Sequence, residues 1–437
     1  MPKPTMTLRG RAALAAGSAA RWASRATGRG AGAMIGGLVA MTLDRSLLGQ
    51  LGAGRRTVVV TGTNGKSTTT RMTAAALATV GPVATNAEGA NMDAGLVAAL
   101  AGARDASLAA LEVDEMHVPH VADAVDPAVI VLLNLSRDQL DRVGEINHIE
   151  RTLRAGLARH PDAVVVANCD DVLMTSAAYD CPRVVWVAAG GGWANDSVSC
   201  PRSGEVIVRD HAHWYSTGTD PNVGPGGPPA FKRPSPQWWY DDTNIYGPDG
   251  LELPMRLSLP GKVNRGNATQ AVAAAVVLGA DPTAAVAAVS RVDEVAGRYQ
   301  TVPMGEHTAR ILLAKNPAGW QEALSMVDRR ADGVVIAVNG QVPDGEDLSW
   351  LWDVNFEHFE GVPVVAAGER GTDLAVRLGY AGVEHTLVHS TIDAIASCPK
   401  GHVEVVANYT AFLQLTRTLG RMNPAGRSAA TRGNNDG

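Results

Sequence analysis

Residues 57–68 read Thr57-Val58-Val59-Val60-Thr61-Gly62-Thr63-Asn64-Gly65-Lys66-Ser67-Thr68. The β-branched run at the start predicts a buried strand. Two glycines then mark a turn, and Lys66 with the hydroxyl residues after it opens a helix. The backbone N–H groups of such a turn, with a helix N-terminus behind them, form a binding site for phosphate. The stretch therefore predicts a nucleoside triphosphate site.

The residue types of this loop fit the chemistry of a bound triphosphate. Lys66 would reach the β- and γ-phosphates, and Ser67 would hold Mg²⁺ through its hydroxyl. The alternative is a Gly-rich turn without function, and the order of strand, glycines, Lys and hydroxyl argues against it. We expect the nucleotide to contact Thr61, Gly62, Thr63, Asn64, Gly65, Lys66, Ser67 and Thr68.

Three further apolar stretches follow, at residues 108–113, 128–135 and 163–168, with helix-like segments between them. Near-continuous apolar strands that alternate with helices predict an α/β fold with a doubly wound parallel sheet. Ligands of such sheets bind beyond the carboxyl ends of the strands. The polar residues at those ends should therefore line the site: Glu112, Asp114, Glu115, Asn134 and Asp138.

The chain has 437 residues, which predicts two or three domains. We expect a basic helical segment at 1–50 and a nucleotide-binding domain at 51–300, with an aromatic, Gly- and Pro-rich insertion at about 190–250. A second α/β block should span 301–422, and the polar tail at 423–437 should be disordered. The strands expected in the second block are 309–313, 334–338, 363–367 and 403–407.

Composition and charge exclude several classes of protein. The hydrophobic content of 46% is that of a globular protein, and the net charge of −6 argues against a nucleic-acid partner. The four cysteines form no C-x-x-C pair, which points to a reducing cytoplasm and not to a disulfide framework. No apolar stretch is long enough to span a bilayer.

The first 43 residues are basic and contain no acid. One interpretation is an amphipathic helix that rests on the inner face of an anionic membrane. The other, which we favour from the sequence, is a surface helix packed on the first domain. The basic residues are Lys3, Arg9, Arg11, Arg21, Arg25 and Arg29.

The stretch Gly62–Thr68 resembles the phosphate loop of the Mur ligase family, whose members form amide bonds to carboxylates of cell-wall precursors. Three motifs resemble its amidating branch: Ser136-Arg137-Asp138-Gln139, Lys315-Asn316-Pro317-Ala318-Gly319 and Asp347-Leu348-Ser349-Trp350. The similarity runs from the basic N-terminal helix to residues 408–410, almost the whole chain. It implies a Mur-ligase-like domain with a small ribbon-like insertion, followed by a C-terminal α/β domain.

The resemblance also implies a reaction. ATP with Mg²⁺ would phosphorylate the α-carboxylate of D-glutamate in the stem peptide of lipid II, and ammonia would then displace the phosphate to give D-isoglutamine. The ammonia would come from glutamine, hydrolysed by a separate glutaminase subunit, GatD. Two alternatives are an amino-acid ligase of the Mur or folylpolyglutamate type and a non-catalytic nucleotide-binding scaffold for a glutaminase.

Individual roles follow from the same resemblance. Glu112 would bind Mg²⁺ with Ser67, and Glu115 would serve a second ion; the alternative is two ordinary acids at a strand end. Asn267 would lie near the adenine, and Arg298 near the ribose or phosphate. Asn267 as a helix N-cap and Arg298 in an interdomain salt bridge are the alternatives.

Asp347 is expected to complete the catalytic triad of the partner glutaminase, in which a carboxylate orients the His that activates a Cys. The alternative is an ordinary surface-loop acid, and Asp344 or Asp353 would fit the sequence pattern equally well.

The insertion departs from many relatives, which carry two C-x-x-C pairs that bind zinc. Here the first pair reads Cys200-Pro201-Arg202-Ser203 and the second is missing. One thiolate cannot form a closed tetrahedral site, although His211 and His213 leave a partial site as an alternative. We therefore predict no zinc, and a ribbon held together by aromatic packing.

Overall fold

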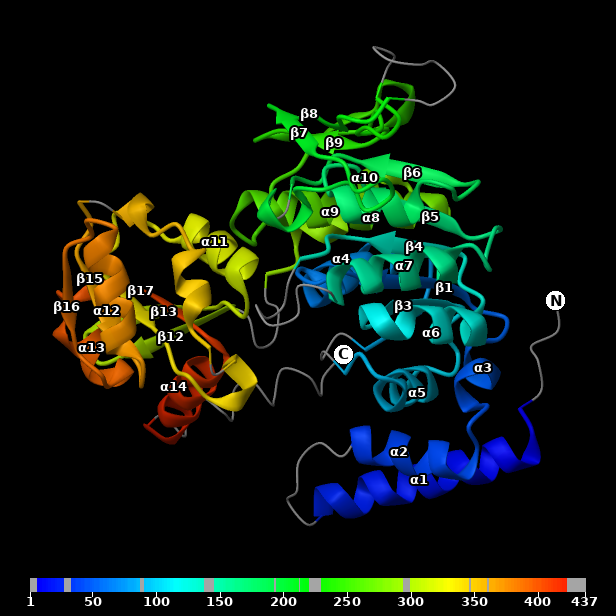
Figure 1. Cartoon of the computed structure of the whole chain (residues 1–437). Coiled ribbons are helices and arrows are strands. Elements are labelled where there is room, and N and C mark those ends of the chain that lie inside the picture. Colours follow the sequence, from blue (N-terminus) through cyan, green and yellow to red (C-terminus); the bar gives the residue numbers. More distant parts are fainter. Residues whose placement is uncertain are drawn as a thin grey trace. The chain divides into compact units, whose positions relative to one another are not determined.

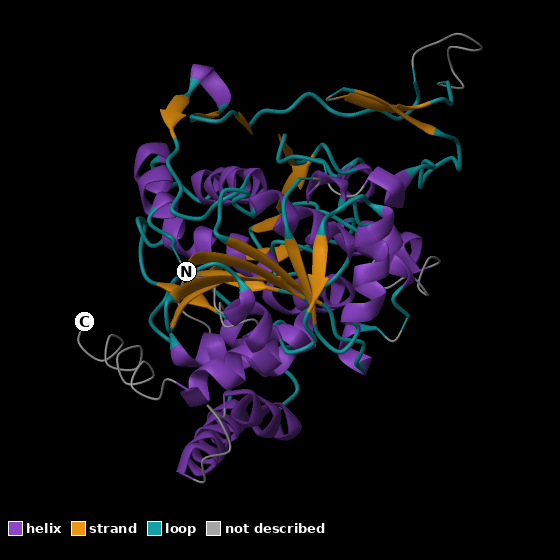
Figure 2. Cartoon of the chain, turned by 90° about the vertical axis from the view of Figure 1, so that its left-hand side faces the viewer, coloured by secondary structure: helices purple, strands orange, loops and turns teal. Residues whose placement is uncertain are grey.

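The computed structural model describes residues 6–26, 33–86, 90–136, 145–191, 194–211, 213–219, 229–293, 299–345, 347–359 and 361–422 (Figure 1). The described elements from Leu8 to Ser290 form one compact unit, and those from Tyr299 to Met422 form a second. Helices flank the strands in both units (Figure 2).

The first unit is built on a six-stranded sheet with the order β2-β3-β1-β4-β5-β6, and every pair of neighbours is parallel. This confirms the predicted parallel sheet. Val60 lies opposite Glu112 and Thr61 opposite Leu132, so the ends of the three central strands meet at one edge. The strands are β1 (Arg56–Thr61), β2 (Val83–Thr85), β3 (Leu108–Glu112), β4 (Val129–Leu132), β5 (Val164–Asn168) and β6 (Val184–Val187).

Helices cover this sheet. One buried cluster joins apolar side chains of the strands to those of α3, α5, α6, α7 and α8, and α4 packs against α9 and α10. The helices are α3 (Leu47–Gly52), α4 (Lys66–Leu77), α5 (Asp93–Gly102), α6 (Val118–Val125), α7 (Glu145–Leu157), α8 (Val172–Ala178), α9 (Lys262–Val277) and α10 (Pro282–Ser290), with a 3-10 turn η1 (Glu115–His117).

Before the sheet, α1 (Leu8–Ala26) and α2 (Ala33–Leu43) lie side by side, with α2 also packed on α5 (Figure 1). Glycine allows this close approach: a Cβ on Gly17 would lie 2.5 Å from the carbonyl oxygen of Gly36, and one on Gly37 would lie 2.0 Å from that of Ala94. Among the described residues, no helix combines the length and the apolar character needed to cross a membrane.

The predicted insertion contains short strands with an aromatic cluster, as expected. Cys200 is buried in this cluster with Val172, Ile207, Trp214 and Phe231, and the rings of Trp214 and Phe231 lie 5.0 Å apart. The elements are η3 (Ala194–Ser197), the antiparallel pair β7 (Ile207–Asp210) and β8 (His213–Ser216), the antiparallel strands β9 (Trp239–Tyr240), β10 (Asn244–Tyr246) and β11 (Glu252–Pro254), and η4 (Pro248–Gly250).

The second unit has a six-stranded sheet with the order β12-β13-β17-β14-β15-β16. Only the edge strand β12 pairs antiparallel, and the four predicted strands form its parallel centre. Two buried clusters hold helices on it, one through α11 and α12 and the other through α13 and α14. The strands are β12 (Tyr299–Met304), β13 (His307–Leu313), β14 (Gly333–Ala337), β15 (Val364–Ala367), β16 (His385–Leu387) and β17 (Gly401–Ala407). The helices are α11 (Pro317–Met326), α12 (Gly371–Tyr380), α13 (Thr391–Ser397) and α14 (Tyr409–Met422), with 3-10 turns η5 (Val342–Asp344), η6 (Ser349–Trp352) and η7 (Glu357–Phe359).

Candidate active site

The predicted phosphate loop connects β1 to α4 at the carboxyl edge of the first sheet. Gly62 and Gly65 have φ values of 141° and 84°, which favour glycine. A Cβ on Gly62 would lie 2.8 Å from Cβ of Leu133, and one on Gly65 would lie 2.9 Å from Oδ1 of Asn267. The loop thus bends tightly between the end of β4 and helix α9.

Hydrogen bonds brace the loop against the segment that follows β4. The Asn64 N–H donates to Asn134 Oδ1 (2.9 Å), and Asn134 Nδ2 donates to the Asn64 carbonyl (3.0 Å). The Thr63 N–H donates to the Asn134 carbonyl (2.9 Å), and the Ser136 N–H donates to Thr63 Oγ1 (3.0 Å). Residues 134–136, which we call the strap, therefore hold the loop in shape before any ligand binds.

A buried carboxylate supports the strap. Asp171 Oδ2 accepts the Leu135 N–H (3.1 Å), and Oδ1 accepts the Met174 N–H (2.8 Å) at the start of α8. Burial raises the pKa of Asp171 to about 6. Asp171 was not among the predicted site residues, although it follows the end of β5, where polar residues of a parallel sheet gather.

Lys66 forms a buried ion pair. Its Nζ donates to the Gly62 carbonyl (2.6 Å) and to Glu115 Oε2 (3.2 Å). Both side chains are about nine-tenths buried, with 11% and 10% of their surface exposed. The structure thus brings two predicted site residues together, with Glu115 neutralising the ammonium beside the loop.

Glu112 ends β3 and is almost fully buried. Asn86 fixes its backbone, because Asn86 Oδ1 accepts the Glu112 N–H and Nδ2 donates to the Glu112 carbonyl, each at 2.8 Å. Oε2 of Glu112 is buried and has no hydrogen-bond partner. A buried carboxylate oxygen without a partner is costly, so a cation there would stabilise it.

These residues fit a magnesium ion better than a closed metal cage. Mg²⁺ is usually held by one or two protein oxygens together with phosphate and water oxygens. Glu112 offers a buried carboxylate, and Ser67 offers a hydroxyl in the first turn of α4. Within the described ranges, no group of three or more His, Cys, Asp or Glu side chains is arranged to hold a metal.

Of the remaining loop residues, Thr61 ends β1 and Thr68 lies in α4, both buried. Asn267 lies inside α9, which begins at Lys262, so its alternative interpretation as a helix N-cap was wrong. Arg298 lies outside the described residues, as does Asp138.

The three aspartates proposed for the glutaminase triad differ in their surroundings. Asp344 is buried and accepts the N–H and the hydroxyl of Thr410, which ties its loop to the start of α14. Asp347 is exposed, and its Oδ1 accepts the Ser349 N–H at 2.8 Å. This backbone hydrogen bond lowers the pKa of Asp347 below its usual value. Asp353 is partly buried.

Aromatic rings stand next to Asp347. A surface hollow of about 710 Å³, counting the part open to solvent, is lined by Asp347 and Trp352 among others. Trp352 and Tyr380 are 57% and 77% exposed, and their rings lie 5.3 Å apart. Beneath Trp352, the buried Arg377 donates to two backbone carbonyls and to Glu357. The exposed ring of Trp352 therefore packs on an arginine that is itself held by several hydrogen bonds.

The Lys-Asn-Pro-Ala-Gly motif at residues 315–319 also has a structural role. Asn316 caps α11, because its Oδ1 accepts the Gly319 N–H at 2.8 Å, and Pro317 occupies the first helical position. The Lys315 ammonium lies 5.2 Å from the centre of the Tyr409 ring.

Three of the four cysteines are poor candidates for a nucleophile. Burial raises the pKa of the Cys169 thiol to about 12 and that of Cys181 to about 11, and it also raises the pKa of Cys398. Thiols with a raised pKa are poor nucleophiles at neutral pH.

The phosphate loop, the parallel sheet and the following α/β unit together form a fold of the Mur ligase type. The Mur ligase middle domain matches residues 60–210, and the MurT ligase C-terminal domain matches residues 313–412. Two segments of the chain thus match models of Mur-type ligase domains, and the chain is similar to MurT.

Two relatives show the extent of this similarity. The MurT subunit of lipid II isoglutaminyl synthase from Streptococcus pneumoniae is 29% identical over 420 residues, which cover 89% of this chain and 93% of the relative. The MurT subunit from Staphylococcus aureus (strain COL) is 28% identical over 436 residues, which cover 94% and 97%.

Solved structures confirm the predicted fold. A pseudomurein peptide ligase type C from Methanothermus fervidus matches with a TM-score of 0.63 and 18% identity, covering 84% of this chain and 79% of that one. MurF from Acinetobacter baumannii matches with a TM-score of 0.63 and 16% identity, covering 87% and 79%. MurF from Thermotoga maritima, solved in complex with ADP, matches with a TM-score of 0.56 and 16% identity, covering 86% and 81%.

Proposed function

We propose that this chain is the ATP-dependent ligase subunit of a lipid II isoglutaminyl synthase. It would transfer the γ-phosphoryl group of ATP to the α-carboxylate of D-glutamate in the lipid II stem peptide. Ammonia from a glutaminase partner of the GatD type would then attack the acyl carbon and release phosphate, leaving D-isoglutamine. The observation that carries the proposal is the similarity to MurT subunits over about nine-tenths of the chain.

The phosphate loop supports the nucleotide half of this reaction. Its N–H groups would bind the phosphates, and Lys66 would place a positive charge beside the transferred group. Ser67 and Glu112 would hold Mg²⁺, which when bound neutralises phosphate oxygens. The ion pair with Lys66 favours a positioning role for Glu115 over the predicted second ion. Asn267, next to Gly65, would contact the nucleotide, and Arg298 keeps its predicted role near the ribose or phosphate.

The surroundings of Asp347 support its proposed role in the glutamine-hydrolysing step of the partner subunit. A triad carboxylate must be ionised, and it must hold the imidazole in one tautomer. Asp347 is exposed, its Oδ1 accepts the Ser349 N–H, and Trp352 lines the same surface hollow. Asp344 is engaged with Thr410, so it is a poorer candidate.

The proposal is tested with the chain in complex with its glutaminase and lipid II as substrate, driven either by glutamine or by ammonium chloride. Asp347→Asn should reduce glutamine-driven amidation by about a hundredfold or more and leave ammonium-driven amidation intact. Lys66→Ala should abolish both. Asp353→Asn is the matched control and should retain both activities.

Each alternative predicts a different result. If the Lys66→Ala complex still amidated lipid II, the chain would be a scaffold and the proposal would fail. If free amino acids supported faster ATP turnover than ammonium, the chain would be an amino-acid ligase. If Asp353→Asn and not Asp347→Asn lost glutamine-driven activity, the triad assignment would pass to Asp353.

A further inference from the structure

The turn after β5 links the insertion to the strap. It comprises residues 169–171, and we call it the β5 turn. Its last residue, Asp171, accepts the Leu135 N–H of the strap at 3.1 Å. The residue before it, Asp170, is also largely buried, with 15% of its side chain exposed. One peptide bond therefore separates the acid that supports the strap from an acid that binds another part of the first unit.

Two buried hydrogen bonds attach the insertion to the β5 turn. Nε of Arg233 donates to Asp170 Oδ1 at 2.7 Å, and only 9% of the Arg233 side chain is exposed. Nε1 of Trp214, in β8, donates to the Cys169 carbonyl at 2.9 Å. The Arg233 N–H also donates to the Trp214 carbonyl at 2.9 Å, which holds these two residues together. Because a charge-assisted hydrogen bond is short and strong, Arg233 fixes the place of Asp170.

The second oxygen of Asp170 holds the segment that leads from β6 into the insertion. Oδ2 accepts the Gly190 N–H at 2.8 Å. The segment packs closely on α9, because a Cβ on Gly266 would clash with the carbonyl oxygen of the residue before Gly190. The next residue of α9 is Asn267, whose side chain lies beside Gly65 of the phosphate loop. Asp170 therefore also connects to the loop through the packing of α9.

A continuous path of hydrogen bonds thus joins Arg233 to the phosphate loop. It runs through Asp170 and Asp171 to the strap, and the strap binds Thr63 and Asn64. Its hydrogen bonds measure between 2.7 and 3.1 Å. A loop that binds phosphate through its N–H groups needs them in one arrangement, and supporting hydrogen bonds of this kind maintain it.

We propose that Arg233 of the insertion positions the phosphate loop for nucleotide binding, and that Asp170 transmits its effect to the strap. Neither residue belongs to the loop or the strap, so both are positioning residues. The inference rests on the nucleotide half of the proposed function and assigns the insertion a part in it. Because coupling between two sites is reciprocal, a nucleotide on the loop should in turn stabilise the insertion.

The first test measures binding of ADP with Mg²⁺ to the full-length chain by calorimetry. Arg233→Gln should weaken ADP binding by about fivefold, as expected for a residue that acts on a site through others. Arg233→Lys keeps a charged donor for Asp170 and should restore the affinity to within about twofold of the wild type. Asp170→Asn should also weaken binding. The double variant of Arg233→Gln and Asp170→Asn should lose less affinity than the two single losses combined, because both remove the same interaction.

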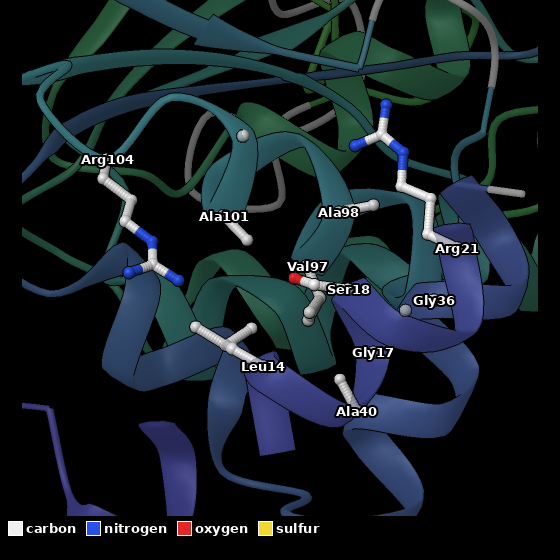
Figure 3. A pocket seen from close by; sticks show the side chains of 12 residues that line it. Leu14, Gly17, Ser18, Arg21, Gly36, Ala40, Val97, Ala98, Ala101 and Arg104 are labelled. Atoms are coloured by element: carbon white, nitrogen blue, oxygen red, sulfur yellow. The ribbon is translucent and has the colours of Figure 1, made fainter. Parts of the chain in front are cut away.

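The matched control is Arg202→Gln, at another arginine of the insertion that forms an ion pair. Nη2 of Arg202 donates to Asp180 Oδ2 at 2.7 Å, beyond the end of α8, whereas Asp171 caps the start of that helix. Arg202→Gln should lower the melting temperature as Arg233→Gln does, but it should leave the ADP affinity unchanged. Arg104→Gln changes an exposed arginine that lines the pocket between α1, α2 and α5 (Figure 3), and it should alter neither quantity.

The second test is hydrogen exchange, which also reports on the chain without nucleotide. The peptide that contains the strap should exchange faster in Arg233→Gln than in Arg202→Gln, because Asp171 would hold the Leu135 N–H less firmly. In the wild type, saturating ADP should slow exchange in β8, and Arg233→Gln should abolish this protection.

The proposal is overturned if Arg233→Gln and Arg202→Gln bind ADP equally well, or if ADP leaves exchange in β8 unchanged in the wild type. Either result, in a complex that amidates lipid II, leaves the proposed function standing. A wild type that shows the coupling but never amidates lipid II would refute the function and support the positioning role of Arg233. A wild type that binds no ADP would refute both.

Discussion

The buried Asp171 carboxylate leads to a prediction about pH. In Asp171→Asn the side chain can accept only one of the two N–H groups that the carboxylate accepts now, so either Leu135 or Met174 loses its acceptor. An N–H left buried without an acceptor costs about 1–3 kcal/mol. The variant also removes a titratable group. This second change alters how the free energy of unfolding depends on pH, and it can be measured independently of the lost hydrogen bond.

The size of that signature follows from the pKa. The carboxyl has a pKa of about 6 in the folded chain, against a reference value of 3.8. Between these two values the folded state holds a proton that the unfolded state has released, so stability falls as pH rises through this window. The full effect is about 3 kcal/mol, of which about 2 kcal/mol falls between pH 4 and pH 6.5. Below this window the protonated Asp171 carboxyl keeps its contribution to the free energy of unfolding, and above this window the contribution is lost completely.

The assay is native-state hydrogen exchange of the peptides that contain β5 and α8, corrected for the intrinsic exchange rate at each pH. The opening free energy of the wild type minus that of Asp171→Asn should fall by about 2 kcal/mol from pH 4 to pH 6.5. Asp281→Asn is the control, because Asp281 caps α10 and should leave β5 and α8 unaffected. A difference between wild type and Asp171→Asn that stays constant with pH would refute the reasoning.

Two further predictions concern the loop and the second unit. Gly65→Ala forces an L-residue to φ 84° and puts a Cβ 2.9 Å from Asn267 Oδ1, so ADP affinity measured by calorimetry should fall by about tenfold or more. The control is Gly279→Ala, which has a φ of 88° and no atom within 4 Å of its Cβ. Both variants should lower the free energy of unfolding by about 1 kcal/mol, but Gly279→Ala should leave the ADP affinity unchanged. Equal ADP affinities in the two variants would contradict this prediction. Arg377→Gln shortens the donor to the carbonyls of Leu351 and Val354 and should destabilise the second unit by about 2 kcal/mol or more in urea unfolding. Arg330→Gln should change it by less than about 0.5 kcal/mol. A loss below about 1 kcal/mol for Arg377→Gln would show that Arg377 is not structural.

The central strands were predictable because they are uninterrupted apolar runs. The strand predicted from Thr57 onward and the stretch 163–168 became β1 (Arg56–Thr61) and β5 (Val164–Asn168), and α4 begins at Lys66, the residue expected to open the helix. Two strands were not predicted: β2, which has only three residues, and β12, an edge strand that contains Pro303. Short strands and edge strands carry weak sequence signals, since neighbouring strands supply most of their stabilisation.

The composition of the site was predictable, but its contacts were not. The loop motif fixed the types and the order of its residues, because the turn and the phosphate need them. The ion pair of Lys66 with Glu115 and the approach of Gly65 to Asn267 join residues that are far apart in the sequence. No local pattern encodes such pairs, since they arise only when strands and helices pack.

Asp344, Asp347 and Asp353 show how the structure separates residues that the sequence cannot. All three lie within ten positions in one loop region, and their side chains are identical. The two oxygens of Asp344 accept hydrogen bonds from Thr410, so this carboxylate stabilises the fold and has little capacity for another protein. Asp347 is exposed, yet its Oδ1 accepts the Ser349 N–H, which holds the carboxylate in place and lowers its pKa. A carboxylate that orients an imidazole must lose little freedom on contact, since each group that is ordered on binding costs free energy. An exposed but already ordered acid meets both requirements, which is why Asp347 is the residue that we expect to serve a partner's active site.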